Sequence, residues 1–180
     1  MSGNIDLIAM LGNLSRSLFP VQSVIIGIAY MLGIIFFITA LQKLRKIGDQ
    51  RANSSSQESI YVPMAYILLG AALLFLPSAL DALSNTTFGV GNVLSYTDYN
   101  KNSIFGSMGL IIRIAGLIWF VRGAVLLTHA SHPGSQSQDG LKGFMFLFAG
   151  ILAVNFDNTV SVIATIFSKI AAFTLNSTSA

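Results

Sequence analysis

Cysteine is absent from the 180 residues of this chain, and charged side chains make up only 9% of them. The absence of cysteine excludes disulfides, thiolate metal ligands and thiol nucleophiles. Soluble domains carry about 25% charged residues, so the small charged fraction excludes an ordinary soluble domain. The net charge of +3 is small and is concentrated in one segment. It therefore indicates membrane topology, and we expect no nucleic-acid partner.

Apolar sequence is what the chain has in abundance, since 53% of its residues are hydrophobic. The apolar residues gather in four runs, at 21–41, 60–80, 104–127 and 141–166. Each run has the roughly 20 residues that a helix needs to cross the ~30 Å hydrocarbon layer. We therefore expect an all-α, polytopic membrane helical bundle with four transmembrane helices, which forms a single domain over residues 1–180.

Residues 1–19 precede the first run and differ from it. Their apolar side chains recur at helical spacing, at Ile5, Ile8, Leu11, Leu14 and Leu18. The segment contains Asp6 before any basic residue and has no continuous apolar core, so it does not resemble a secretory signal. We predict an N-terminal amphipathic helix that lies in the interface and ends before Pro20, with a surface helix packed on the bundle as the alternative.

Two of the runs contain residues that interrupt helices. Pro77 falls in the last turn of the second run, where it should kink or end the helix. Asn155 and Asp157 interrupt the fourth run. Asp157 either ends the span early, leaving a C-terminal amphipathic helix, or lies within it. Because residues 144–154 alone are too few to cross a bilayer, we expect the span to continue to residue 166, with Asp157 at the outer interface.

Basic residues predict the orientation. They gather in the segments inside the two expected hairpins, at Lys43, Arg45, Lys46, Arg51 and Lys142. The opposite side has fewer of them, among which are Arg16 and Lys101. The positive-inside rule then makes both hairpin loops cytoplasmic and both termini periplasmic. The basic cluster after the first run would also contact anionic lipid.

The two halves of the chain look duplicated. Residues 31–41 align with residues 114–124 without a gap, which matches Gly33 with Gly116. Gly70 and Gly150 correspond if the second hairpin loop is three residues shorter. Each copy would contain two spans, so the copies would be parallel repeats, each of them a hairpin.

The third run contains a glycine stripe and an arginine. Gly109, Gly116 and Gly123 recur every seven residues and lie on one helix face, where small residues let a neighbouring helix approach closely. Arg113 shares that face, about nine residues into the run and roughly 14 Å from its outer end. We expect Gly33 and Gly70 to be packing positions as well.

An arginine at this depth costs several kcal/mol unless it faces protein or water. The candidate partners of Arg113 are Asp81 and Asp157. One interpretation is a buried ion pair that sets helix register or subunit assembly. The other is an ion or proton path, which usually needs more than one titratable group at the membrane midplane.

No motif favours an enzyme. A hydrolase nucleophile elbow, a phosphate loop and a metal-protease helix are all missing from the sequence. His129 and His132 have the spacing of a helical metal pair, but Pro133 follows at once and no third ligand is nearby. We expect loop histidines, with neither a cofactor nor a metal site.

One known family shares several short motifs with this chain. They are Tyr30–Gly33, Phe36–Phe37, Ala40–Leu41, Lys43, Pro63, Leu68–Pro77 and Thr86–Gly89. With these motifs and four spans, the chain resembles the IcmC/DotE family, which is related to IcmD/DotP. These are small inner-membrane proteins of type IVB (Dot/Icm) secretion systems. In the second half the Leu-Pro pair is missing, and Asn155 and Asp157 stand near its place.

The resemblance implies a non-enzymatic structural subunit in the bacterial inner membrane. Its partners would be other membrane proteins of the secretion apparatus, with a homo-oligomer as a further form. The alternative is a small oligomeric transporter or pore in which Arg113 lines a polar path. A holin-like lytic protein is a third hypothesis.

Overall fold

A computed structural model describes residues 3–52, 60–89, 104–132 and 137–178 of the chain. The regular structure of these residues is helical throughout, which confirms the predicted all-α class. The helices are α1 (Gly3–Ala52), α2 (Tyr61–Leu74), α3 (Leu76–Phe88), α4 (Ile104–Ala130), α5 (Ser137–Val154) and α6 (Phe156–Thr178). Lys101, which we assigned to the outer side, lies outside the described residues.

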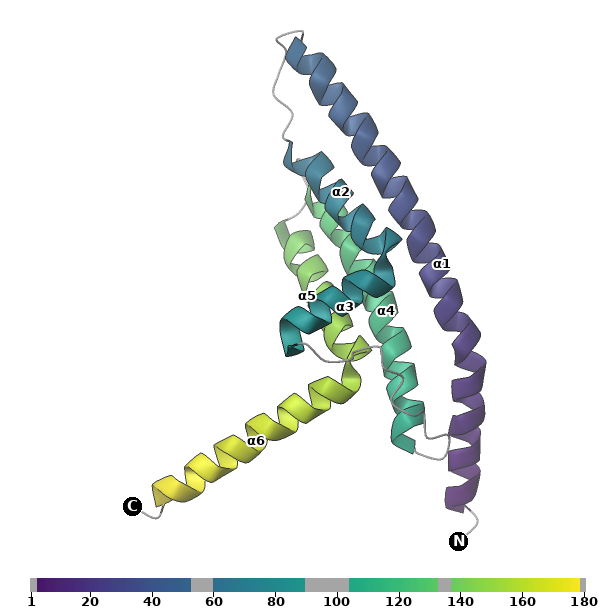
Figure 1. The fold of residues 1–180 in the computed structure, drawn as a ribbon, viewed down its shortest axis with the longest axis vertical. Helices are drawn as coiled ribbons and strands as arrows, with labels where there is room; N and C mark the ends of the chain where they lie inside the picture. The colour runs from purple at the N-terminus through teal and green to yellow at the C-terminus, as the bar shows by residue number, and fades with distance from the viewer. Residues whose placement is uncertain (1–2, 53–59, 90–103, 133–136, 179–180) are drawn as a thin grey trace.

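The helices pack as two antiparallel pairs, α1 with α2 and α4 with α5, and α1 also packs along α4 (Figure 1). One apolar cluster joins the pairs. Its buried members include Ala29, Ala40, Tyr66, Leu73, Leu117, Phe120, Ala124 and Ile151. The small alanines at 29, 40 and 124 are wholly buried, which lets the helices come close at the centre of the bundle.

The first helix is much longer than we expected. α1 has 50 residues, about 75 Å at 1.5 Å per residue, and it runs without a break through Pro20. The predicted end of an amphipathic helix before Pro20 is therefore wrong. A proline inside a helix removes one backbone hydrogen bond, and the long apolar sequence that follows keeps the helix intact. α1 also continues past the end of the first apolar run at residue 41, through Gly48 to Ala52.

The second apolar run bends sharply, as Pro77 predicted. α2 ends at Leu74, α3 begins at Leu76, and the two axes differ by 101°. Pro77 lies in the first turn of α3. Its ring would clash with the carbonyl of residue 73 in a continuous helix, so the chain turns at Phe75. Residues 60–80 therefore do not form one straight span.

The fourth run also differs from the prediction. The helix breaks at Asn155, so residues 141–166 are not one helix. Instead, α5 begins earlier, at Ser137, and its 18 residues give it a length of about 27 Å. The eleven residues that seemed too few for a span are thus only part of α5. The alternative that Asp157 stands just beyond a break, with a separate C-terminal helix, describes the structure.

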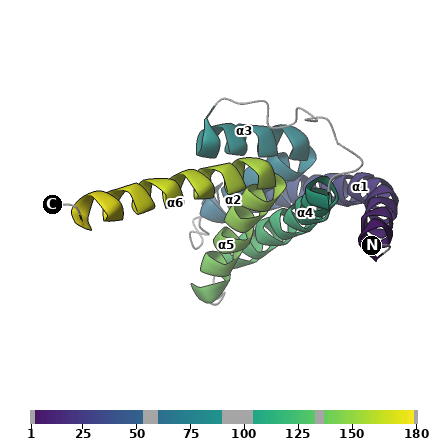
Figure 2. The ribbon, with the colours of Figure 1, turned by 90° about the horizontal axis from the view of Figure 1, so that it is seen from below.

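Three helical segments of the described residues are long and apolar enough to cross a membrane, and the bent α2–α3 pair would add a fourth. The three are Gly12–Ala52, Ser107–Ala130 and Phe156–Thr174. The last segment, in α6, buries none of its residues against the rest of the chain. Seen from below, α3 and α6 leave their helix breaks in the same direction (Figure 2).

Candidate functional site

Two glycines pack backbone to backbone between α4 and α5. A Cβ built on Gly116 would lie 2.9 Å from the carbonyl oxygen of Gly150 and 2.8 Å from the amide nitrogen of Val154. A Cβ built on Gly150 would lie 2.8 Å from the carbonyl oxygen of Gly116. Real Cβ atoms essentially never come so close to backbone, so both positions require glycine.

Three more of the predicted packing glycines lie against helices of the same chain. A Cβ on Gly33 would lie 2.9 Å from the carbonyl oxygen of Gly70, and the reverse contact is 3.2 Å to the Gly33 oxygen. A Cβ on Gly123 would lie 2.8 Å from the carbonyl oxygen of Gly143. Gly109 differs, because its Cβ would meet only the Phe156 ring, at 3.8 Å. The glycine contacts therefore hold each hairpin together within the chain.

Side chains around Asn155 donate hydrogen bonds to carbonyl groups at the helix break, and the Ile151 carbonyl also keeps its backbone bond from the Asn155 N–H. Asn155 Nδ2 donates to the carbonyl oxygen of Ile151 at 2.9 Å. The Thr159 hydroxyl donates across the break to the carbonyl oxygen of Leu152 at 2.8 Å. The last carbonyls of any helix lack partners within it, and in an apolar medium that is costly. Thr159 thus satisfies a carbonyl group that the end of α5 leaves without a backbone partner.

Arg113 and Asp157 form an ion pair between α4 and the first turn of α6. The guanidinium donates to the Asp157 carboxylate through Nη2. A carboxylate in the first turn of a helix also interacts favourably with the helix dipole. The side chains are 38% and 63% exposed, so the pair lies at the edge of the bundle.

Asp81, the other candidate partner of Arg113, lies on α3 and forms no ion pair with it within 4 Å. Its Oδ1 atom is buried without a hydrogen-bond partner, as is the Nε atom of Arg113. The structure therefore brings Arg113 to Asp157 and leaves Asp81 apart. The pair attaches the start of α6 to α4 immediately after the break.

The four basic residues that we placed after the first span lie on the last part of α1. Lys43, Arg45, Lys46 and Arg51 are all helical, at the end of α1 that leads into the first hairpin connection. Lys43 Nζ stands 5.7 Å from the centre of the Tyr66 ring of α2. This end of α1 therefore packs on α2 and also carries the positive charge of the four basic residues.

A contact between Tyr66 and His132 escaped the sequence analysis. Their rings meet edge to face at 5.7 Å, and the Tyr66 hydroxyl lies 3.4 Å from His132 Nε2. His132 Nδ1 lies 3.1 Å from the carbonyl oxygen of Thr128, which can only accept, so Nδ1 carries a proton. In the neutral ring, Nε2 then accepts from Tyr66. The two residues are 66 positions apart in the sequence, so no local pattern could have indicated this pairing.

These side chains hold helices in place, and no reactive constellation is found among them. In the described part of the chain, no three His, Asp or Glu residues lie close enough together to hold a metal ion. Comparison with known proteins adds nothing to this picture. No family model matches the chain, and no curated protein or solved structure matches it either.

Proposed function

We propose that this protein is a non-enzymatic structural subunit of a membrane assembly. The observation that carries the proposal is α6, a 23-residue helix that leaves the bundle and buries none of residues 156–174 against it. Its exposed apolar side chains include Val160, Ile163, Phe167 and Ile170, which recur every three or four residues on one face. Such a face is suited to pack against a helix of another subunit.

The resemblance to the IcmC/DotE family supports a more specific form of the proposal. In it, the chain belongs to the inner-membrane part of a type IVB secretion apparatus and contributes to protein transport through helix packing. Both hairpin connections would be cytoplasmic and both termini periplasmic. The basic end of α1, from Lys43 to Arg51, supports this orientation because it lies at the end of the hairpin that the positive-inside rule assigns to the cytoplasm.

We also propose that the two hairpins are parallel repeats. Gly70 packs against Gly33 and Gly150 packs against Gly116, so each contacts the glycine that the alignment matches in its own hairpin. The helix breaks at Phe75 and Asn155 are separated by the same 80 residues as these glycines. The repeats would thus share a long helix, a shorter partner, a break and a helix that turns away.

Purification in gentle detergent from the native host, followed by mass spectrometry, tests the proposed function. A structural subunit is recovered with other membrane proteins of one apparatus. Recovery of the chain alone, as a defined homo-oligomer, would refute this proposal and favour the transporter or pore. Arg113→Lys then tests the polar path. Lysine keeps the positive charge that pairs with Asp157, but it alters the geometry of a pore lining.

A further inference from the structure

The outer face of the α4–α5 hairpin contains an apolar groove of about 380 Å³. One stripe of α5 and a single residue of α4 form it. Its lining residues are Trp119, Leu141, Lys142, Met145, Phe146 and Ala149. Trp119 and Met145 are 43% and 58% exposed, so the groove opens outward, away from the apolar cluster of the bundle.

Two cations stand at one end of this groove. Lys142 belongs to its lining, and the Arg122 guanidinium lies 4.8 Å from the centre of the Phe146 ring. Both are at the same level along the hairpin, because Gly123 meets Gly143 directly. Among the described residues, neither cation forms a salt bridge within 4 Å.

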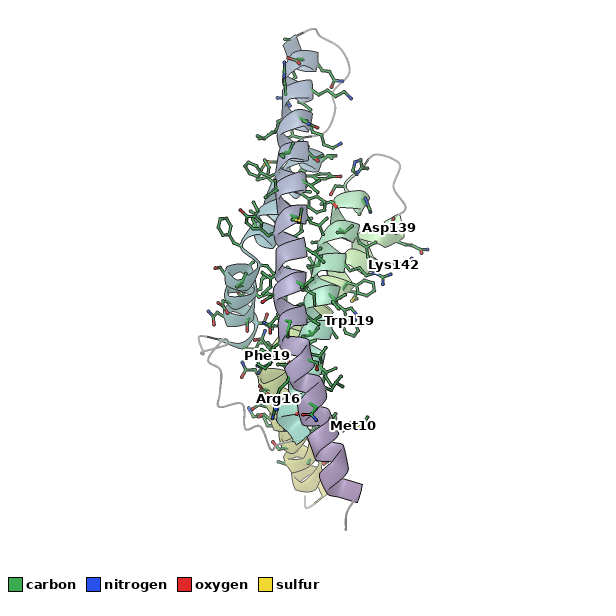
Figure 3. The ribbon with its side chains drawn as sticks, turned by 90° about the vertical axis from the view of Figure 1, so that its right-hand side faces the viewer. Met10, Arg16, Phe19, Trp119, Asp139 and Lys142 are labelled. Atoms are coloured by element: carbon green, nitrogen blue, oxygen red, sulfur yellow. The ribbon has the colours of Figure 1, made fainter. Side chains whose placement is uncertain are left out.

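The remainder of the groove is apolar and leads away from the charges. From Lys142 to Ala149 is seven residues, or about 10 Å along α5. Figure 3 shows Lys142 and Trp119 on one face of the molecule, with Lys142 nearer the end where α1 terminates. A ligand that fits must carry negative charge at one end and an apolar chain behind it.

We propose that this groove binds an anionic glycerophospholipid. Its phosphate contacts Arg122 and Lys142, and one acyl chain lies along Trp119, Met145 and Ala149. Basic residues between transmembrane helices at the cytoplasmic side attract acidic lipid headgroups in this way. A water-soluble anion would not use the apolar wall, and a zwitterionic lipid would not neutralise the two cations. The site is independent of the proposed structural function.

The protein carries its own probe, because Trp119 is the single tryptophan of the chain. The purified full-length protein is placed in vesicles that contain either phosphatidylglycerol or phosphatidylcholine with the same brominated chains. Bromine quenches a nearby indole, so the dependence of quenching on lipid fraction gives the relative binding constant. We expect phosphatidylglycerol to quench at a lower mole fraction than phosphatidylcholine.

Substitutions then separate a site from general attraction to negative lipid. Arg122→Gln and Lys142→Gln should each lower the preference for phosphatidylglycerol roughly fivefold, and the double variant about 30-fold. Arg16→Gln removes the same charge from an exposed position on α1, outside the basic cluster at the end of that helix, and should leave the preference unchanged. Quenching by phosphatidylcholine should be the same in all variants, which verifies that the hairpin is folded.

Two results would overturn the proposal. One is equal quenching by both lipids in the unsubstituted protein. The other is a loss of preference in Arg16→Gln as large as in Lys142→Gln, because then bulk charge and not the groove selects the lipid.

Discussion

Gly116 of α4 and Gly150 of α5 meet backbone to backbone, so that a Cβ on either would lie within 3.0 Å of the other's carbonyl oxygen. Gly33 and Gly70 make the corresponding contact between α1 and α2. Close approach of this kind strengthens van der Waals packing between helices, which is a main source of stability inside a membrane. The glycines therefore stabilise the chain itself, whereas none of residues 156–174 of α6 is buried against the rest of the described chain.

Enlarging Gly116 should separate α4 from α5. Gly116→Ala is expected to lower the stability of the protein by about 1–3 kcal/mol, because the added methyl group meets backbone that cannot yield. Gly27→Ala is the matched control, since its Cβ would have nothing within 4 Å and alanine favours a helix. Thermal unfolding in detergent compares the two, and equal melting temperatures would contradict the packing described above.

The ion pair should be detectable as a coupling between two substitutions. In a double-mutant cycle, Arg113→Gln and Asp157→Asn are expected to couple by about 1 kcal/mol, the upper range for partly exposed pairs. The cycle of Arg113→Gln with Asp81→Asn should be additive to within about 0.5 kcal/mol. Denaturant unfolding in micelles measures both cycles. A larger coupling with Asp81 would show that α3, and not α6, is attached to Arg113.

Removing the side chains that donate hydrogen bonds at the break between α5 and α6 should straighten the chain there. In the double variant Asn155→Leu with Thr159→Val, the Ile151 carbonyl keeps its backbone bond from Asn155, but the Leu152 carbonyl loses its side-chain partner. In an apolar medium the Leu152 carbonyl then finds a partner only in a continuous helix, where the Phe156 N–H reaches it. Because the chain has no cysteine, spin labels attach only at Phe144→Cys and Phe167→Cys. The distance between the two labels should increase towards roughly 35 Å, which is the length of 23 residues in a straight helix.

Thr165→Val is the control for this experiment. Its hydroxyl bonds to the carbonyl of Ser161 inside α6, away from the break, so the label separation should stay at its original value. An unchanged separation in the Asn155 and Thr159 double variant would mean that these side chains do not determine the break.

The orientation of the chain in the membrane can be measured by labelling introduced cysteines, because the chain has none of its own. Thr87→Cys, exposed on α3, should react with a membrane-impermeant maleimide added from the periplasmic side. Arg45→Cys, exposed on the basic end of α1, should react only after the inner membrane is opened. The opposite order of labelling would contradict the cytoplasmic placement of the hairpin connections.

The features that could be predicted from sequence are local ones. Pro77 predicts a bend because its ring cannot fit in a continuous helix. The seven-residue spacing of Gly116 and Gly123 indicates a packing face. The continuity of α1 through Pro20 could not be predicted, since it depends on how far the flanking sequence offsets one lost hydrogen bond. The early start of α5 was missed because the polar residues after Ser137 resemble a loop.

Contacts between segments that are distant in the sequence could not be predicted from it. Both Asp81 and Asp157 were reasonable partners for Arg113, and only the direction in which α6 leaves the break selects Asp157. The contact between Tyr66 and His132 depends on how the two hairpins pack. The groove beside Trp119 exists only because α4 and α5 lie side by side.

The central claim is that α6 docks on another subunit, and alanine substitution of its apolar face tests it most directly. Alanine keeps the helix while removing the side chains that a partner would contact. The test variant changes three exposed residues of α6, and its control changes three exposed apolar residues of α1. The substitutions are Ile163, Phe167 and Ile170 to Ala in the first, and Met31, Ile35 and Ile38 to Ala in the second.

The measurement is the yield of co-purifying membrane proteins when each tagged chain is isolated in gentle detergent from the native host. Our account predicts that the α6 variant is made and inserted at normal levels but loses its partners, while the α1 control retains them. Full recovery of the same partners with the α6 variant would contradict the account.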